Sequence, residues 1–260
     1  MDKNTGDDRI KCSVNGAIAT IMIDRPEKLN ALDFEMIMAL ERAALLIDAD
    51  SSIRVAIITG SGEKCFCSGG DIAAWSSWPP EQFGLKWVRD GHRAFDALAR
   101  LRQPLIAALN GHVLGGGLEL AVTADIRIAE ENVKFGLPET GLGIIPGWSG
   151  TQRAVRRLGS QTVRRMAIMG EVFTASEAVK LGIADRVVAK GQSYSEAVKM
   201  TEALLVRGPI ATQVAKLLIN AAEGEDAERA MEALAGLAAA GNSEMQAGVA
   251  AFKEKRKPGF

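Results

Sequence analysis

The chain is poor in cysteine and histidine, with three cysteines and two histidines among its 260 residues. An odd number of cysteines in a long chain without a secretory leader favours a reducing compartment. Cys65 and Cys67 are separated by one residue and lack the partner ligands of a zinc site. We therefore predict no metal site, and we interpret these two residues and Cys12 as small buried side chains.

Long apolar runs are also missing from the chain. No segment approaches the roughly 20 apolar residues that a transmembrane helix requires. The first eight residues are polar and acidic, unlike a secretory leader or an arginine-rich transit peptide. We therefore expect no membrane partner and a cytoplasmic location.

An excess of charge of either sign is absent as well, because the formal net charge is −1. Lysine and arginine are spread among aspartate and glutamate, so the chain offers no broad field for nucleic acid or an anionic membrane. Hydrophobic residues make up 47% of the sequence, which is ample for a buried core. We predict a globular protein that binds no nucleic acid and that meets any polyanionic ligand with local groups.

The spacing of apolar residues predicts an α/β fold. Strand-like runs at residues 17–23 and 55–59 flank a helical pattern over residues 34–47, which Asp33 can cap. Further strands are expected at residues 106–109, 126–129 and 186–188. Alternation of this kind is typical of α/β proteins.

From about residue 193 onward the pattern indicates helices only. This change divides the chain into a core of residues 1–192 and a helical region of residues 193–260.

Three consecutive glycines at residues 115–117 precede an apolar run that predicts a helix start. Glycines let the main chain approach a ligand closely, and free N–H groups at a helix start favour negative charge. Glu119 lies in the first turn, where apolar neighbours raise the pKa of a carboxyl group. A second carboxylate, Glu139, follows twenty positions later. The pattern thus predicts a backbone anion site beside two acids.

Several other blocks occur in the order that is typical of one family, at residues 24–32, 55–60, 66–71, 124–129, 135–139, 143–147, 150–153 and 252–258. With the glycine block they make the chain resemble the crotonase superfamily, also called the enoyl-CoA hydratase/isomerase family. The resemblance covers nearly the whole chain. It implies a crotonase-like spiral of repeated β-β-α units, followed by a C-terminal helical region that packs homotrimers or hexamers made of two trimers.

The same resemblance implies a catalytic site for hydration of a 2-enoyl-CoA, an activity of fatty acid metabolism. The main-chain N–H groups of Ser68 and Gly116 would form the oxyanion hole for the thioester oxygen. Glu119 would deprotonate a water molecule, and Glu139 would give a proton to C2. Two carboxyl groups around one water can supply both base and acid, because like charges push their pKa values apart. Structural roles at a helix start and in an ion pair are the alternatives for these glutamates.

Contacts to the acyl-CoA are also implied by the resemblance, at Lys28, Leu29, Ala31, Ser68, Gly70, Asp71, Ile72, Gly115, Gly147, Trp148, Phe252 and Lys255. The last two match tail positions that reach the nucleotide end of coenzyme A, in some members across a subunit interface. A basic tail that is merely solvated is the alternative. Coenzyme A enters as part of the thioester substrate, and no further cofactor is expected.

Several alternatives stay open at this point. Trp148 stands where the family often has a smaller residue, so its indole either narrows the acyl pocket or faces the core. A Δ3,Δ2-enoyl-CoA isomerase can operate with Glu139 alone, and a non-catalytic CoA-binding scaffold needs neither glutamate. A serine hydrolase is disfavoured because no histidine lies near Ser68 in the sequence, and we interpret His112 as a packed loop residue.

Overall fold

The computed structural model describes residues 1–240 and 243–259. The chain divides into two compact units, Met1–Thr212 and Gln213–Phe260. The first unit combines two β-sheets with helices, which confirms the α/β class predicted from the apolar pattern.

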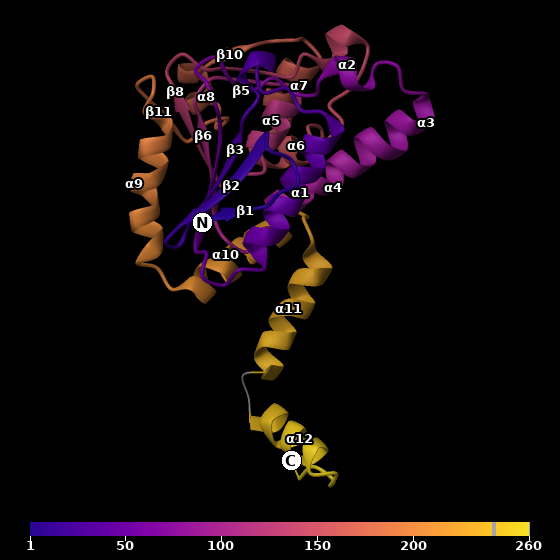
Figure 1. The fold of residues 1–260 in the computed structure, drawn as a ribbon, viewed down its shortest axis with the longest axis vertical. Helices are drawn as coiled ribbons and strands as arrows, with labels where there is room; N and C mark the ends of the chain where they lie inside the picture. Colours follow the sequence, from indigo (N-terminus) through magenta and orange to yellow (C-terminus); the bar gives the residue numbers. More distant parts are fainter. Residues whose placement is uncertain (241–242, 260) are drawn as a thin grey trace. The chain divides into compact units, whose positions relative to one another are not determined.

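The larger sheet has seven strands within the described residues. In spatial order they are β1 (Asp2–Lys3), β2 (Ile10–Asn15), β3 (Ile18–Ile23), β4 (Val55–Gly60), β6 (Leu105–Leu109), β8 (Ile126–Glu130) and β11 (Arg186–Val188) (Figure 1). Strands β1 to β3 pair antiparallel, and every pair from β3 to β11 is parallel. Strands β4 and β6 are buried along their whole length, which explains their continuous apolar runs.

The smaller sheet is made of short strands in the order β10 (Phe173–Thr174), β9 (Lys134–Gly136), β7 (His112–Leu114) and β5 (Cys65–Cys67). Strands β5, β7 and β9 are parallel neighbours, whereas β10 is antiparallel to β9. The carboxyl ends of parallel strands meet at one edge of a sheet. The segments that follow β5, β7 and β9 therefore lie together, and they carry residues 68–71, the glycine block and Glu139.

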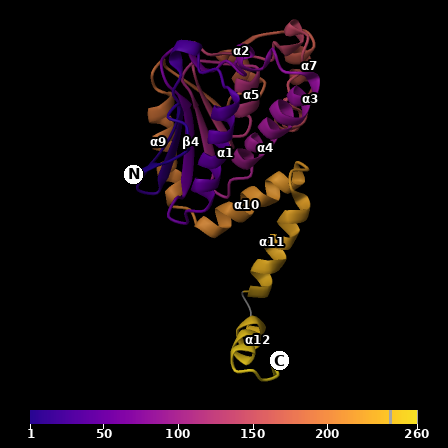
Figure 2. The same ribbon diagram turned by 45° about the vertical axis from the view of Figure 1, so that its right-hand side comes forward.

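The helices of the first unit are α1 (Phe34–Asp48), α2 (Ile72–Trp75), α3 (Pro80–Gln82), α4 (Arg89–Ala99), α5 (Gly116–Ala121), α6 (Arg153–Leu158), α7 (Ser160–Ala167), α8 (Ala175–Lys180) and α9 (Ser193–Leu205). Two short 3-10 helices, η1 (Pro26–Lys28) and η3 (Glu139–Leu142), and a π-helix, η2 (Phe83–Val88), lie between them. Asp33 caps α1 as predicted, because its Oδ1 accepts the Met36 N–H. Helix α1 packs on β2 and β3, and α9 packs on the opposite face of the sheet (Figure 2).

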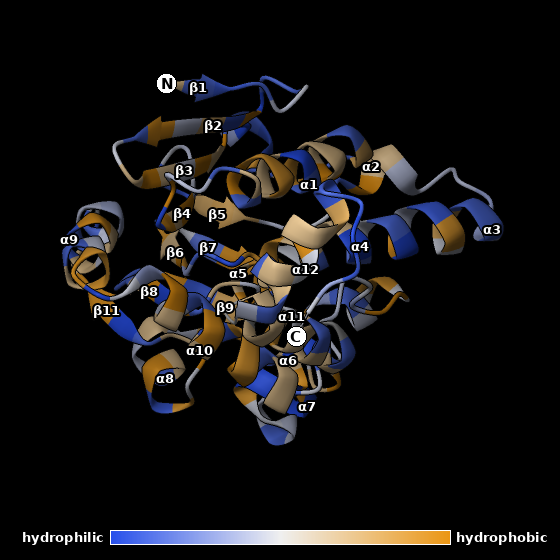
Figure 3. Cartoon of the chain, turned by 90° about the horizontal axis from the view of Figure 1, so that it is seen from below, coloured by the Kyte–Doolittle hydropathy of each residue, from blue (hydrophilic) through white to orange (hydrophobic). Residues whose placement is uncertain are grey.

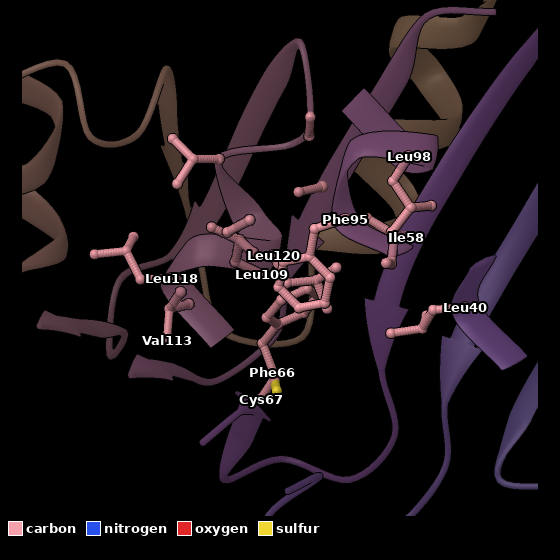
Figure 4. Close-up of a cluster of buried hydrophobic side chains, with 14 of the residues drawn as sticks. Leu40, Ile58, Phe66, Cys67, Phe95, Leu98, Leu109, Val113, Leu118 and Leu120 are labelled. Carbon is pink, nitrogen blue, oxygen red and sulfur yellow. The ribbon is translucent and has the colours of Figure 1, made fainter. Parts of the chain in front are cut away.

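Apolar side chains fill both sides of the larger sheet. Val55, Ile57 and Ile106 face α9, where Ala197 packs against them. The main core lies on the other side, around the fully buried rings of Phe66 and Phe95 (Figure 4). Burial of each large side chain of this kind stabilises the fold by about 1.5–3 kcal/mol. Strands β3 and β4 are coloured mainly as hydrophobic in Figure 3, whereas α4 alternates hydrophilic and hydrophobic residues, of which Phe95 and Leu98 are buried in the main core.

The three cysteines belong to these buried layers. Cys12, Cys65 and Cys67 are all buried and unpaired with one another, as predicted. Burial raises the pKa of the Cys12 thiol to about 11, which keeps it protonated and unreactive at neutral pH.

Residues after 193 are helical in their described part. Helix α9 belongs to the first unit, and α10 (Pro209–Ala222) begins there and continues into the second. The second unit goes on with α11 (Ala227–Ala240) and α12 (Ser243–Lys253). Large apolar side chains stay exposed on these last helices, among them Met231, Met245 and Phe252.

Candidate active site

A cavity opens where the segments after β5, β7 and β9 meet. Its polar lining comes from Ser68, Glu119 and Glu139, and its glycines are Gly69, Gly70, Gly115, Gly116 and Gly147. The other lining residues are apolar, namely Ile72, Trp75, Phe83, Trp87, Val88, Pro138, Leu142, Ile144, Ile145 and Trp148. The site is thus an apolar pocket that contains two carboxyl groups and is lined in part by the backbone of its glycines.

Glu119 projects into this cavity from α5 and is 3% exposed. Its Oε1 accepts the backbone N–H groups of Trp148 and Gly150, each at 2.6 Å. Burial raises the pKa of Glu119 to about 8, and the nearby charge of Glu139 adds to the rise, while the N–H donors oppose it. The chain therefore orients this carboxyl group firmly and makes its ionisation costly.

Glu139 begins η3 on the other side of the cavity and is 7% exposed. Burial raises the pKa of this carboxyl group to about 7. Its Oε2 has no hydrogen-bond partner among the described residues. A buried polar atom without a partner is rare in proteins and marks a group that is available to a ligand.

Gly115 joins β7 to α5, which carries Glu119, and it lies close to the Glu139 carboxyl group. Its φ of +55° suits glycine, and a Cβ at this position would come within 2.9 Å of Oε1 of Glu139. The Gly115 N–H donates to the Gly136 carbonyl at 2.9 Å, which ties the glycine block to the end of β9. A larger residue at 115 would push the Glu139 carboxyl group away.

Two backbone N–H groups near the cavity are free to bind an anion. In the part of the chain that the structure describes, neither Gly70 nor Gly116 has a hydrogen-bond partner for its N–H. The two glycine segments touch, since a Cβ on Gly69 would lie 3.0 Å from the Gly116 nitrogen. The Ser68 N–H, in contrast, donates to the Leu29 carbonyl at 3.2 Å. Sequence reasoning named Gly116 and Ser68 for this role and missed the amide of Gly70.

The segment predicted to contact coenzyme A lies beside these glycines. Lys28, Leu29 and Ala31 are in or next to η1, and Leu32 forms a parallel bridge with Gly70. The Asp71 N–H donates to the Leu32 carbonyl at 2.7 Å. The structure therefore brings residues 28–31 together with residues 68–72 at the edge of the cavity.

Arg25 stabilises this edge and was not singled out from the sequence. Its guanidinium donates to the Ala31 carbonyl at 3.0 Å and pairs with Asp71 at 3.0 Å. Asp71 also caps α2 by accepting the Ala73 N–H. The Asp71 carboxylate is thus engaged by Arg25 and by the Ala73 N–H. The sequence did not reveal this, because Arg25 lies far from Asp71 along the chain and meets it only in the fold.

The two tail residues predicted to bind coenzyme A belong to the second unit. Phe252 lies in α12 and is 85% exposed, and Lys255 follows with a φ of +53°. Their role at the nucleotide end of coenzyme A stays a prediction.

His112, the second histidine, is placed on β7, where its Nδ1 accepts the Lys134 N–H at 3.3 Å.

The sequence profile of one protein family, described as "Enoyl-CoA hydratase/isomerase", matches residues 13–260. The chain belongs to this family. The family predicted from the motifs is therefore confirmed. Among the residues described, no cluster of three His, Cys, Asp or Glu side chains is placed to hold a metal ion, and no helix is both long and apolar enough to cross a membrane.

Individual family members are similar to the chain over almost its full length. It is 36% identical to the crotonyl-CoA hydratase of Syntrophomonas wolfei, with 94% of both chains covered. It is 34% identical to the short-chain-enoyl-CoA hydratase of Clostridium acetobutylicum, with 93% of both covered. The crystal structure of the enoyl-CoA hydratase from Bacillus anthracis superposes with a TM-score of 0.80 at 33% identity, covering 97% of this chain and 98% of that one. The crotonase-like fold is confirmed by this likeness.

Proposed function

We propose that the protein is an enoyl-CoA hydratase, which adds water reversibly across the C2=C3 bond of a 2-enoyl-CoA to give a 3-hydroxyacyl-CoA. The observation that carries this proposal is the pair of buried carboxyl groups, Glu119 and Glu139, that line one cavity beside free backbone N–H groups. The names of the relatives from Syntrophomonas wolfei and Clostridium acetobutylicum support the same activity.

The thioester oxygen is bound by the N–H groups of Gly70 and Gly116 in this proposal. We choose Gly70 over Ser68 because the Ser68 N–H already donates to Leu29. Attack of water on C3 moves negative charge onto the thioester oxygen. A main-chain donor aimed at such a charge contributes roughly 3–4 kcal/mol of transition-state stabilisation in other enzymes.

The two glutamates share the proton transfers. The charge of one carboxylate opposes ionisation of the other, so the pair holds one proton near neutral pH. The pKa of Glu119, about 8 with its N–H donors included, lies above that of Glu139, but a water molecule that donates to the Glu119 carboxylate favours the ionised form of this group. We therefore assign Glu119 as the base that takes a proton from water. Glu139, in its protonated form, gives a proton to C2.

The activity is tested by incubating the purified protein with short, medium and branched 2-enoyl-CoA thioesters and following the loss of the conjugated enoyl absorbance. A 3-enoyl-CoA serves as the second substrate, because an isomerase would convert it to the conjugated 2-enoyl form. Hydration of at least one 2-enoyl-CoA is expected. Isomerisation without hydration would favour the isomerase, and binding without turnover would favour a non-catalytic CoA-binding protein.

We also propose that the chain forms a homotrimer or a hexamer through its C-terminal helices. Exposed apolar side chains in the second unit support this, because Met231, Met245 and Phe252 are 67%, 48% and 85% exposed. We also propose a cytoplasmic location, because the three cysteines are buried and free, as is usual in a reducing compartment.

A further inference from the structure

The indole of Trp148 occupies space that two glycines, Gly91 and Gly116, leave open. A Cβ on Gly91 would lie 2.2 Å from the indole nitrogen, and one on Gly116 would lie 2.4 Å from Cζ3 of the ring. A Cβ on Gly70 would lie 3.4 Å from Cη2. Only the first two distances are clashes, so α4 and α5 leave room for the ring, while Gly70, in the segment after β5, is in ordinary contact with it.

Trp148 is held at both ends. Its backbone N–H donates to Oε1 of Glu119, and its indole N–H donates to the Trp87 carbonyl at 3.0 Å. The ring also packs against Trp87 and Phe95, with centroids 5.1 Å apart in each pair. With 3% exposure and both donors engaged, the indole is a fixed wall.

This wall borders the cavity in which the proposed function places the acyl group of the substrate. The amides of Gly70 and Gly116 set the position of the thioester oxygen, and the glutamates set the positions of C2 and C3. The Trp148 ring lies against both amide glycines and extends to Trp87, which itself lines the cavity. The free volume left at the site is about 90 Å³. Pockets that enclose drug-sized ligands usually measure ~300–1,000 Å³, so this cavity is small for a long acyl chain.

We infer that the Trp148 indole sets the acyl specificity of the site and restricts it to short-chain 2-enoyl-CoA thioesters such as crotonyl-CoA. This inference rests on the proposed hydratase function. The ring has little freedom to move, because Gly91 and Gly116 lie so near it that a Cβ on either would clash with it. A longer chain would have to displace the ring and break its hydrogen bond to Trp87.

The main test compares kcat/KM for crotonyl-CoA, hexenoyl-CoA and decenoyl-CoA in the wild type and in Trp148→Ala. We expect the wild type to prefer crotonyl-CoA and the variant to shift the ratio of decenoyl-CoA to crotonyl-CoA by at least roughly tenfold. A shift of that size corresponds to the burial of about two methylene groups. Trp148→Phe, which keeps a ring in the core, should give a smaller shift in the same direction.

Trp78 offers a matched control. It packs on Trp87 with a centroid distance of 6.1 Å but, among the described residues, it is not part of the cavity lining. Trp78→Ala should therefore leave the chain-length profile unchanged. An equal shift in Trp78→Ala and Trp148→Ala would overturn the inference, since it would assign the effect to general loosening of the aromatic cluster.

A second test uses Gly91, which lies in α4 and is absent from the cavity lining in the described chain. Gly91→Ala should push the indole towards the cavity and lower kcat/KM for crotonyl-CoA at least roughly tenfold. Alanine usually stabilises a helix relative to glycine, so a loss of helix propensity would not explain this decrease. The same change in a Trp148→Ala background should cost less than about twofold, because neighbouring sites that share one contact are not additive. An equal loss in both backgrounds would overturn the inference.

The outcomes separate this inference from the function on which it rests. A wild type that hydrates decenoyl-CoA as well as crotonyl-CoA, or a Trp148→Phe variant with an unchanged profile, contradicts the inference and leaves the hydratase function standing. A wild type that hydrates no 2-enoyl-CoA contradicts both.

Discussion

At the residue scale, the site depends on two carboxyl groups held in unlike surroundings. Glu119 accepts two backbone N–H groups at 2.6 Å, whereas Oε2 of Glu139 has no partner among the residues that the structure describes. Both are buried, and burial raises the pKa of each. One group is thus oriented and the other is left open to a ligand, which suits a base and an acid that act on the same substrate.

We expect Glu119→Gln and Glu139→Gln each to lower kcat at least ~100-fold, because a general acid or base typically contributes that much. Titration calorimetry with butyryl-CoA, which cannot be hydrated, should show that thioester binding persists. Glu131→Gln is the control, since this exposed glutamate lies outside the cavity lining and should keep full activity. Near-normal hydration by either site variant would exclude the two-glutamate mechanism.

The raised pKa of Glu139 predicts a stability effect with a definite sign. Its pKa moves from 4.5 to about 7, so the folded state binds more protons than the unfolded state between these values. The contribution of Glu139 to the free energy of unfolding therefore falls as the pH rises from about 4.5 to 7, by a total of about 3 kcal/mol. Glu139→Gln removes the cost of ionisation.

Thermal unfolding at pH 5 and pH 8 tests this expectation. The variant should gain stability relative to the wild type at pH 8 and gain much less at pH 5. A difference between variant and wild type that is the same at both pH values would show that Glu139 ionises as easily in the folded protein as in the unfolded chain.

Sequence motifs named Glu119, Glu139 and Gly116, which the structure places in the lining of one cavity. They also named the amide of Ser68, which donates to Leu29, and did not name the free amide of Gly70. The reason is a contact between residues that are far apart in the sequence. The Ser68 N–H is occupied by the carbonyl of Leu29, a residue almost forty positions earlier. No local pattern reveals which of two neighbouring amides is taken by a distant carbonyl. The position of Trp148 against distant glycines was hidden for the same reason.

At the scale of elements, the glycine turn before α5 controls the geometry of the site. Gly115 has a positive φ, and the space beside it belongs to the Glu139 carboxyl group. We expect Gly115→Ala to cost about 1–3 kcal/mol in stability from backbone strain and to lower kcat by displacing that carboxyl group. Thermal unfolding and the hydration assay measure the two effects separately.

Gly159 provides the control for this prediction. It also has a positive φ, +84°, but a Cβ there would meet nothing within 4 Å. Gly159→Ala should lose a similar amount of stability while kcat stays near the wild-type value. If both variants lost activity to the same extent, backbone strain alone would explain the result and the contact with Glu139 would be irrelevant.

Helix α1 and most strands of the larger sheet, including the short β11, were predictable from the sequence, whereas β2, α4 and the smaller sheet were not. Helix α1 has regular apolar spacing and an Asp33 cap, and β4 is a continuous apolar run. Strands β5, β7, β9 and β10 have two or three residues each, too few to show a period of two. The π-helix η2 has no simple sequence signature either. The small sheet that places the site was therefore missed, although the motifs at its ends were found.

At the scale of the whole molecule, the C-terminal helices give a test of assembly. Met245 and Phe252 in α12 are exposed in the single chain, and large exposed apolar side chains commonly mark an interface. Light scattering on the purified protein should show a trimer or a hexamer. Removal of residues 245–260 should weaken both assembly and binding of coenzyme A thioesters. A monomer that keeps full activity after this truncation would contradict the proposed oligomer.

The loop at residues 28–31 is held in place by contacts within the protein. Leu29 and Asn30 both have positive φ, at 54° and 56°, a costly conformation for residues other than glycine. The buried Asn30 side chain maintains it by donating to the carbonyls of Ser61 and Cys65. Under the proposed function, a segment that folding has already ordered has little conformational entropy left to lose when a thioester binds. The free-energy cost of ordering this loop then belongs to folding and does not recur with each substrate molecule.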